Sequence, residues 1–218
     1  MSLPDIADEF APQPTTAQVE RFRGLRWTVR SDTVDLENGE SVVRDLIVHP
    51  GAVGIVAIDD QNRVLLNRQY RHPVGAYLWE PPAGLMDLPG ESPLDCAKRE
   101  FAEEAGLAAT SWQVLFDFYN SPGGTTEAFR CFLARDLREL PEGRPLGEAE
   151  EAGLEPRWVG LDQALALVQA GRLGNPTAVT GILAAHAAQQ SGWSNLRPGD
   201  APWGVREDLI MTDRVRLD

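Results

Sequence analysis

The chain has 218 residues, of which 43% are hydrophobic and 24% charged, and this ordinary globular composition excludes a disordered or fibrous protein. The 33 acidic residues outnumber the 20 basic ones, so the formal charge of −13 repels phosphates and argues against nucleic acid as a partner. Two cysteines are too few for a disulfide framework. The acidic first residues and the lack of a long apolar run predict a cytoplasmic protein with no membrane partner.

The N-terminal part of the sequence is predicted to divide into a lead-in and a β-hairpin. Residues 1–20 mix prolines with polar residues, and we expect a loosely ordered segment there. Residues 21–50 follow as the hairpin region, in which Arg26–Leu36 partly alternates between polar and apolar residues. An Asn-Gly pair, typical of tight hairpin turns, then leads into a second strand at Ser41–His49.

The main domain is expected over residues 51–192, with residues 193–218 as a C-terminal tail. It begins with the apolar run Gly51–Ile58, which is typical of a strand covered on both faces. Further strands are predicted at Arg63–Arg71, Trp112–Tyr119, Ala128–Leu133 and Arg157–Val159, and helices at Pro93–Ala105, Leu161–Ala170 and Pro176–Gln190. Strands before and between helices favour an α/β (α+β) architecture, a mixed sheet packed by helices.

The predicted helix at Pro93–Ala105 carries an acidic face. Glu100 and Glu104 are four residues apart and stack on one face, with Glu103 beside them, and like charges at this spacing weaken an isolated helix. One interpretation is a solvated acidic surface with basic neighbours on the same helix. The other is a magnesium site, because Mg²⁺ prefers carboxylate and carbonyl oxygens and is usually shared with substrate phosphates.

The segment Gly84–Leu107 resembles the Nudix box, G-x5-E-x7-R-E-U-x-E-E-x-G-U, in which U is aliphatic. Eight fixed positions are matched, by Gly84, Glu91, Arg99, Glu100, Glu103, Glu104, Gly106 and Leu107. Two positions depart from the pattern: six residues rather than five separate Gly84 from Glu91, and Phe101 occupies an aliphatic position. The extra residue lies in the loop before the helix and leaves the spacing of the helical glutamates unchanged.

The resemblance implies a Nudix-type α/β/α sandwich with a mixed sheet and an N-terminal β-hairpin extension. It also implies a site for Mg²⁺, or Mn²⁺ in its place, with ligands from the Ala83 main-chain oxygen, Glu100, Glu103 and Glu104. Arg99 and Glu91 would hold the ligand carboxylates and the preceding loop in position. A fold of this family without metal or turnover, acting as a ligand sensor, is the main alternative.

Three further segments resemble the ADP-ribose pyrophosphatase branch of the family. They are Arg63–Gly75 followed by Trp79–Gly84, the turn Ser121–Glu127 with Pro122 fifteen residues after Leu107, and the N-terminal hairpin. The resemblance implies hydrolysis of the small molecule ADP-ribose to AMP and ribose 5-phosphate, by a homodimer that exchanges its hairpins. Another nucleoside diphosphate sugar is the alternative substrate. A scaffold that binds a partner through exposed Trp193 and Trp203 is the alternative from a different class of function.

Candidate substrate-binding and catalytic residues follow from the same resemblance. The substrate-binding candidates are Arg71, Arg44, Trp27, Glu80, Leu85, Glu127 and Gly124. Each has a plainer interpretation, for example Arg71 as a solubilising residue on an edge strand, Trp27 as packing and Glu127 as a surface residue after a turn. The catalytic base is expected in the acidic loop 147–153, with Glu151 favoured over Glu150, and Glu103 is a third candidate.

Overall fold

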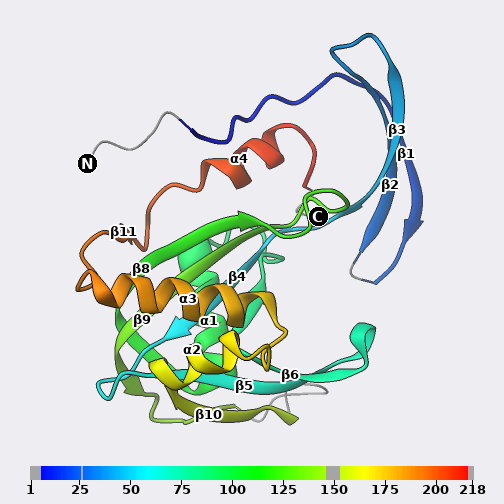
Figure 1. Cartoon of the computed structure of the whole chain (residues 1–218). Helices are drawn as coiled ribbons and strands as arrows, with labels where there is room; N and C mark the ends of the chain where they lie inside the picture. The colour runs from blue at the N-terminus through cyan, green and yellow to red at the C-terminus, as the bar shows by residue number, and fades with distance from the viewer. Residues whose placement is uncertain (1–5, 26, 146–152, 216–218) are drawn as a thin grey trace. The chain divides into compact units, whose positions relative to one another are not determined.

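The computed structural model describes residues 6–25, 27–145 and 153–215, and the chain forms two compact units (Figure 1). The larger unit consists of residues 51–118 and 129–202. The smaller unit gathers residues 1–50, 119–128 and 203–218 from three parts of the chain. None of the helices in the described part of the chain is long and apolar enough to span a membrane.

The larger unit contains a five-stranded mixed sheet in the order β11-β8-β9-β4-β7. Its strands are β4 (Ala52–Ala57), β7 (Ala83–Leu85), β8 (Leu107–Tyr119), β9 (Ala128–Glu139) and β11 (Arg197–Pro198). Every residue of β4 is buried, as the continuous apolar run predicts. The strand pairs in parallel with β9 and antiparallel with β7, so the short β7 is fixed against the most buried strand of the sheet.

A second, antiparallel sheet of the larger unit has the order β10-β5-β6. It is formed by β10 (Glu155–Gly160), β5 (Arg63–Arg71) and β6 (Ala76–Glu80), and the 3₁₀ turn His72–Val74 joins the last two. The bounds of β5 are those predicted from the sequence, whereas β6 and β7 are not among the predicted strands. β5 lies between two partners and pairs with β10 over Arg63–Arg68 and with β6 over Asn67–Arg71.

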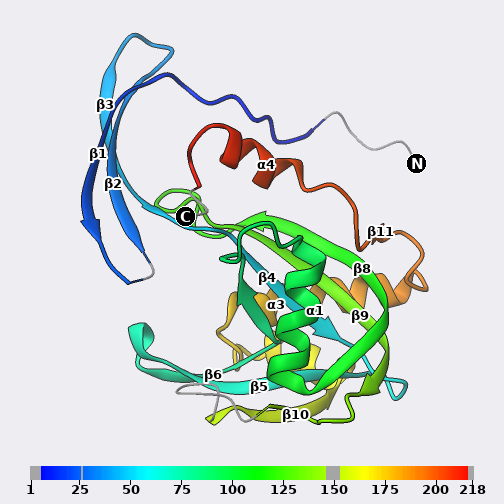
Figure 2. The same ribbon diagram turned by 180° about the vertical axis from the view of Figure 1, so that it is seen from behind.

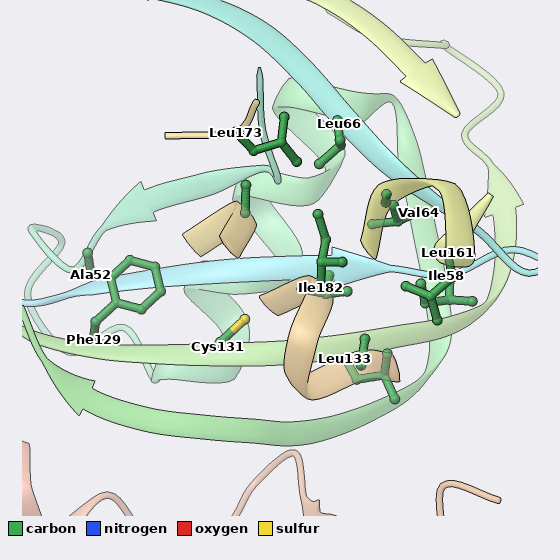
Figure 3. Close-up of a cluster of buried hydrophobic side chains, with 14 residues drawn as sticks. Ala52, Ile58, Val64, Leu66, Phe129, Cys131, Leu133, Leu161, Leu173 and Ile182 are labelled. Atoms are coloured by element: carbon green, nitrogen blue, oxygen red, sulfur yellow. The ribbon is translucent and has the colours of Figure 1, made fainter. Parts of the chain in front are cut away.

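Three helices cover the larger unit: α1 (Pro93–Ala105), α2 (Leu161–Gln169) and α3 (Pro176–Gln190). The side chains of β4 alternate between two hydrophobic clusters. Val53 and Ile55 belong to the cluster that contains Phe101 of α1, and Val56 to the cluster that contains Ile182 of α3. Figure 3 shows the cluster that contains Ile182. The two opposite views in Figures 1 and 2 show that α1 and α3 lie on opposite faces of the sheet. The predicted α/β/α sandwich is therefore confirmed.

The smaller unit is built on a three-stranded antiparallel sheet rather than a two-stranded hairpin. Its strands are β1 (Thr15–Arg23), β2 (Thr28–Asp35) and β3 (Ser41–Val48), with β2 in the centre. The sequence predicts the last two. The first begins inside the segment 1–20 that was expected to be loosely ordered. It is missed because nearly all of its side chains are exposed and a register shift between Glu20 and Phe22 breaks the alternation of its few apolar residues.

The C-terminal residues contribute a helix to the smaller unit. This helix, α4 (Gly204–Met211), was not predicted, because the segment was interpreted as a tail. Trp203 before it is only 4% exposed and packs with Leu209 and Ala128. In the larger unit, Trp193 packs against the main hydrophobic cluster and carries the Arg135 guanidinium 5.0 Å from its ring centre. The idea of a scaffold that presents both tryptophans on its surface is therefore wrong.

Candidate active site

The acidic helix α1 begins and ends where its sequence predicts. The Ser92 side chain accepts a hydrogen bond from the Asp95 backbone N–H at 3.1 Å, and Pro93 occupies the first turn. Gly106 ends the helix at φ +66°, a left-handed conformation that glycine adopts without strain. Ala97 and Phe101 are fully buried, and this fixed core face holds the glutamates at the helix surface in one orientation.

The carboxylates of α1 fold back onto the short strand β7. Glu104 Oε2 accepts a hydrogen bond from the Ala83 backbone N–H at 3.2 Å. Glu100 lies so close to Gly84 that a Cβ atom on that residue would fall within the Glu100 carboxyl group. The box glycine is therefore required by space rather than by backbone conformation, since any side chain there would displace the carboxylate.

Arg99 joins three of the box glutamates. Its Nε and Nη2 atoms donate to the two oxygens of Glu91 at 2.8 and 3.0 Å, a bidentate pair. Its Nη1 atom donates to Glu100 at 2.8 Å and to Glu103 at 3.1 Å. The hydrogen bonds from Arg99 lower the pKa of Glu91, and the same bonds raise the pKa of Arg99 above its ordinary value.

The site has more negative than positive charge. One guanidinium faces Glu91, Glu100 and Glu103, and Glu104 adds a fourth carboxylate beside β7. In the conformation described, no three or more His, Cys, Asp or Glu side chains within residues 6–25, 27–145 and 153–215 form a group that could hold a metal ion. The donors nevertheless fit a hard divalent cation, because they are oxygen atoms gathered around a glycine that leaves room for them.

Cys96 lies beneath these carboxylates and faces the core. It is fully buried, and its Sγ atom donates to the Leu85 carbonyl at 3.4 Å. Burial is the main reason that its thiol pKa is raised, with the charges of Glu91 and Glu100 acting in the same direction. The thiol is therefore protonated at neutral pH and suits neither a nucleophile nor a metal ligand.

Arg71 and Glu80 form a second charged group in the larger unit. Arg71 donates to Glu80 through Nε at 3.0 Å and through Nη2 at 2.6 Å. The Glu80 side chain is 5% exposed and the Arg71 side chain 41% exposed. Because Arg71 is paired with a buried carboxylate, it is more than a solubilising residue, although the ladder between β10 and β5 covers only Arg63–Arg68.

Other substrate-binding candidates lie in the smaller unit. The Trp27 ring is stacked on His49, with ring centres 4.6 Å apart, and remains 40% exposed. Burial lowers the pKa of His49 to about 4. Glu127 accepts a hydrogen bond from Asn120 Nδ2 at 2.8 Å, and its carboxylate is 3.8 Å from His49 Nε2. Glu127 is mostly buried, so its interpretation as a surface residue is wrong, and burial raises its pKa.

Gly124 and Arg44 also belong to the smaller unit. The Gly124 carbonyl accepts the Ile47 backbone N–H at 2.9 Å, which ties the turn to β3. A Cβ atom on Gly124 would meet open space, so no backbone or packing constraint in the described residues demands glycine there. Arg44 lies exposed on β3, opposite Asp32 in the register. Glu150 and Glu151, the favoured base candidates, lie outside the described residues.

Asn67 is a buried polar residue that the sequence analysis did not single out. It is 2% exposed and directly follows the buried apolar residues Val64, Leu65 and Leu66 of β5. In antiparallel pairing it stands directly opposite Glu80. The available signal was the polar residue itself, at a position where the strand pattern calls for an apolar one.

Comparison with known proteins assigns the family. The sequence pattern of the NUDIX domain matches residues 48–178, and the chain belongs to the Nudix family, as the box predicts. A protein of Mycobacterium tuberculosis named ADP-ribose pyrophosphatase is 42% identical over 192 residues, which cover 88% of this chain and 91% of that protein. A Bacillus subtilis protein of the same name is 36% identical over 157 residues, covering 72% of this chain and 83% of its own length.

The fold has a counterpart among solved structures. The crystal structure described as an ADP compounds hydrolase superposes with a TM-score of 0.73 and covers 85% of this chain and 98% of its own. The sequences are 22% identical, so this likeness concerns the fold. It shows that this arrangement of strands and helices recurs in a solved structure of low sequence identity.

Proposed function

We propose that the protein hydrolyses the diphosphate bond of ADP-ribose and releases AMP and ribose 5-phosphate. The observation that carries this proposal is the 42% identity, over 88% of the chain, to a protein named ADP-ribose pyrophosphatase. The geometry of the larger unit supports the chemistry, because oxygen donors from α1 gather at β7 within reach of the Ala83 and Gly84 backbone. A diphosphate substrate matches a site rich in carboxylates only if a divalent cation joins them.

That cation is Mg²⁺ in this proposal, with Mn²⁺ as a substitute. Glu100 and Glu104 are its main ligands, with Glu103 beside them and the Ala83 main-chain oxygen completing the set. Bound there, the metal supplies charge neutralisation for the diphosphate and lowers the pKa of a coordinated water. Arg99 holds Glu100 and Glu103 one turn apart, and its bidentate bond to Glu91 ties the helix to the preceding loop.

The remaining steps belong to residues of this chain. Arg71 binds a phosphate oxygen and offsets the negative charge that develops as water attacks phosphorus and the bridging P–O bond breaks. Glu151, or next Glu150, takes the proton of the attacking water, a role typically worth about 10²–10⁴-fold in rate. In the smaller unit, Trp27 offers a flat aromatic surface for a nucleobase. Arg44, Glu80, Leu85, Gly124 and Glu127 stay predicted substrate contacts.

The test is a turnover assay with purified protein, ADP-ribose and Mg²⁺, in which AMP and ribose 5-phosphate are measured together. A substrate series with ADP-glucose, GDP-mannose, NADH and diadenosine polyphosphates runs beside it. Faster cleavage of another sugar nucleotide would overturn the substrate while leaving the chemistry in place. Binding of ADP-ribose with no AMP released would instead identify a sensor.

We also propose a homodimer formed through the three-stranded sheet. The register places Val19 and Phe22 of β1 and Val43 and Ile47 of β3 on one face, and all four are at least 40% exposed. The opposite face carries the buried Arg30–Asp32 ion pair, at 2.7 Å, and is already packed. Exposed apolar side chains gathered on one sheet face are typical of a protein interface.

Analytical ultracentrifugation tests this assembly directly. The wild-type protein is expected to sediment as a dimer, and Val43→Asp as a monomer, because a charge would have to be buried in the interface. Val74→Asp, at an exposed apolar residue of the larger unit, serves as the control and is expected to remain dimeric. A monomeric wild-type protein would contradict the proposal.

A further inference from the structure

Asn67 carries a polar group for which the fold provides no visible use. Its side chain is 2% exposed, and neither its Nδ2 nor its Oδ1 atom has a hydrogen-bond partner among the residues that the structure describes. Buried polar atoms are nearly always paired, and leucine or valine would satisfy the same strand position without this cost. A polar residue kept at such a place indicates that a partner becomes available in another state of the protein.

The surroundings of Asn67 identify that partner. In the β5–β6 ladder Asn67 stands directly opposite Glu80, so the two side chains lie on the same face. Arg71 is four residues further along β5 and therefore also on this face. The two strands run side by side in both views (Figures 1 and 2). The buried Glu80 carboxylate thus has the Arg71 guanidinium on one side and the Asn67 amide on the other.

This arrangement matters because Arg71 has two tasks. It holds Glu80 in a bidentate pair, with contacts of 3.0 and 2.6 Å, and in the proposed function it must also reach a phosphate oxygen. A guanidinium that moves to the substrate withdraws its charge from a carboxylate that is only 5% exposed. A buried carboxylate left without a donor is strongly unfavourable, so the movement would be opposed by the loss of the Glu80 pair.

We propose that Asn67 is a positioning residue that takes over Glu80 when Arg71 turns to the substrate diphosphate. The Cβ atoms of directly opposite residues are about 4.5–5.5 Å apart, which an asparagine and a glutamate side chain can bridge by rotation. The Nδ2 group of Asn67 then donates a hydrogen bond to Glu80, so Arg71 can leave while the buried carboxylate keeps a donor. The inference rests on the proposed function, since it needs a substrate that draws Arg71 away.

The experiment compares Asn67→Leu with the wild-type protein in steady-state kinetics and in calorimetric titration with ADP-ribose. Leucine keeps the branched shape of asparagine and removes the donor, so the Kd and KM for ADP-ribose are expected to rise about tenfold with kcat little changed. The midpoint of thermal unfolding is expected to stay the same or to rise, because an unpaired amide has been replaced by an apolar group. A loss of affinity without a loss of stability separates this role from a structural one.

A double-mutant cycle with Arg71→Ala makes the test specific. In that background Asn67→Leu is expected to have no further effect on the Kd, because there is no guanidinium left to release. Asn67→Ser, which keeps a hydroxyl donor, is expected to recover part of the affinity. Asn67→Val replaces the leucine variant if the latter does not fold. Thr177→Val, a buried polar residue on α3, is the matched control and should leave the Kd unchanged.

Two results would overturn the inference: an unchanged Kd in Asn67→Leu, or the same increase with and without Arg71. Neither result would touch the proposed function, which the wild-type turnover of ADP-ribose tests by itself. Conversely, a wild-type protein that releases no AMP would refute the proposed function, whatever the variants bind.

Discussion

Glutamates in the two units of the molecule meet opposite surroundings. In the larger unit, Arg99 donates hydrogen bonds to Glu91, Glu100 and Glu103, and this guanidinium lowers the pKa of Glu91. In the smaller unit, Glu127 is buried beside a histidine whose own pKa is lowered to about 4, and burial raises the pKa of Glu127. Arg99 therefore favours the anionic form of Glu91, whereas burial pushes Glu127 toward its neutral form.

The difference shows what a local motif can and cannot specify. Residues one helical turn apart share a face wherever the helix lies, so the spacing in α1 is enough to gather its carboxylates. The surroundings of Glu127 depend on Asn120 and His49, which come from different segments, and no spacing rule connects them. Local sequence spacing is therefore enough to gather the carboxylates of α1, whereas the surroundings of Glu127 depend on tertiary structure.

The largest expected effect is that of Glu104→Gln. Removing one anionic oxygen donor beside β7 should lower kcat by about 10²–10³-fold, in line with the loss of one strong electrostatic contact to a transition state. The carboxamide can still accept the Ala83 N–H, so circular dichroism and the unfolding midpoint should remain close to wild type. Glu139→Gln, at an exposed residue of β9, is the control and should keep full activity. Unchanged turnover in Glu104→Gln would remove this residue from the metal site.

Gly84→Ala tests the same region by steric crowding, without changing a charge. The new methyl group would occupy the position of the Glu100 carboxyl group, so that carboxylate must move. We expect kcat to fall about 10–100-fold and the Mg²⁺ concentration needed for half-maximal activity to rise, as for residues that orient metal ligands. Gly174→Ala, where a Cβ atom meets open space, should be neutral in both measurements. A fully active Gly84→Ala would show that Glu100 need not lie against β7.

Much of the larger unit could be predicted because its signals are local. Ser92 and Gly106 mark the ends of α1, and the apolar run after Gly51 marks the buried strand β4. Each signal depends on neighbours in sequence, through capping, left-handed glycine or continuous burial. The helix that carries the site and the strand beneath it were therefore readable from the sequence.

The remaining features depend on contacts between distant segments. β1 is paired along its length with β2, yet nearly all of its side chains are exposed, so only the ladder reveals it. The tail contains α4, whose Leu209 packs with Trp203 and Ala128. Asn67 looks unremarkable until the register places it opposite Glu80. No periodicity in the sequence encodes such pairings.

Glu91→Gln tests how much the ion pair between Glu91 and Arg99 contributes to the stability of the fold. Because Arg99 lowers the pKa of Glu91 in the folded protein, the pair stabilises the fold above the ordinary value of 4.5. That contribution is lost as the pH falls below 4.5 through the lower pKa of the folded state. At pH 7 we expect a loss of about 1 kcal/mol, or about 2–4 °C in the unfolding midpoint.

The control for Glu91→Gln is Glu142→Gln, at an exposed residue after β9. Calorimetry from pH 7 to pH 3 should show that the loss of stability in Glu91→Gln becomes smaller as the Glu91 carboxylate of the wild-type protein is protonated. The control should follow the wild type throughout. A deficit that does not depend on pH would mean that shape, not charge, is what Glu91 contributes.

Glu127→Gln should have the smallest effect and the opposite sign. Burial raises the pKa of Glu127 in the folded protein above its ordinary value of 4.5. Ionisation of Glu127 therefore lowers the stability of the fold as the pH rises from 4.5 through the raised pKa. Glutamine removes this cost and can still accept from Asn120, so we expect a gain of about 0.5–1 kcal/mol at pH 7 that vanishes below pH ~4.5. With its pKa near 4, His49 is neutral at pH 7 and gives the carboxylate no opposing charge. Thermal unfolding at both pH values checks the sign, and a glutamine variant less stable at pH 7 would place a cation beside Glu127.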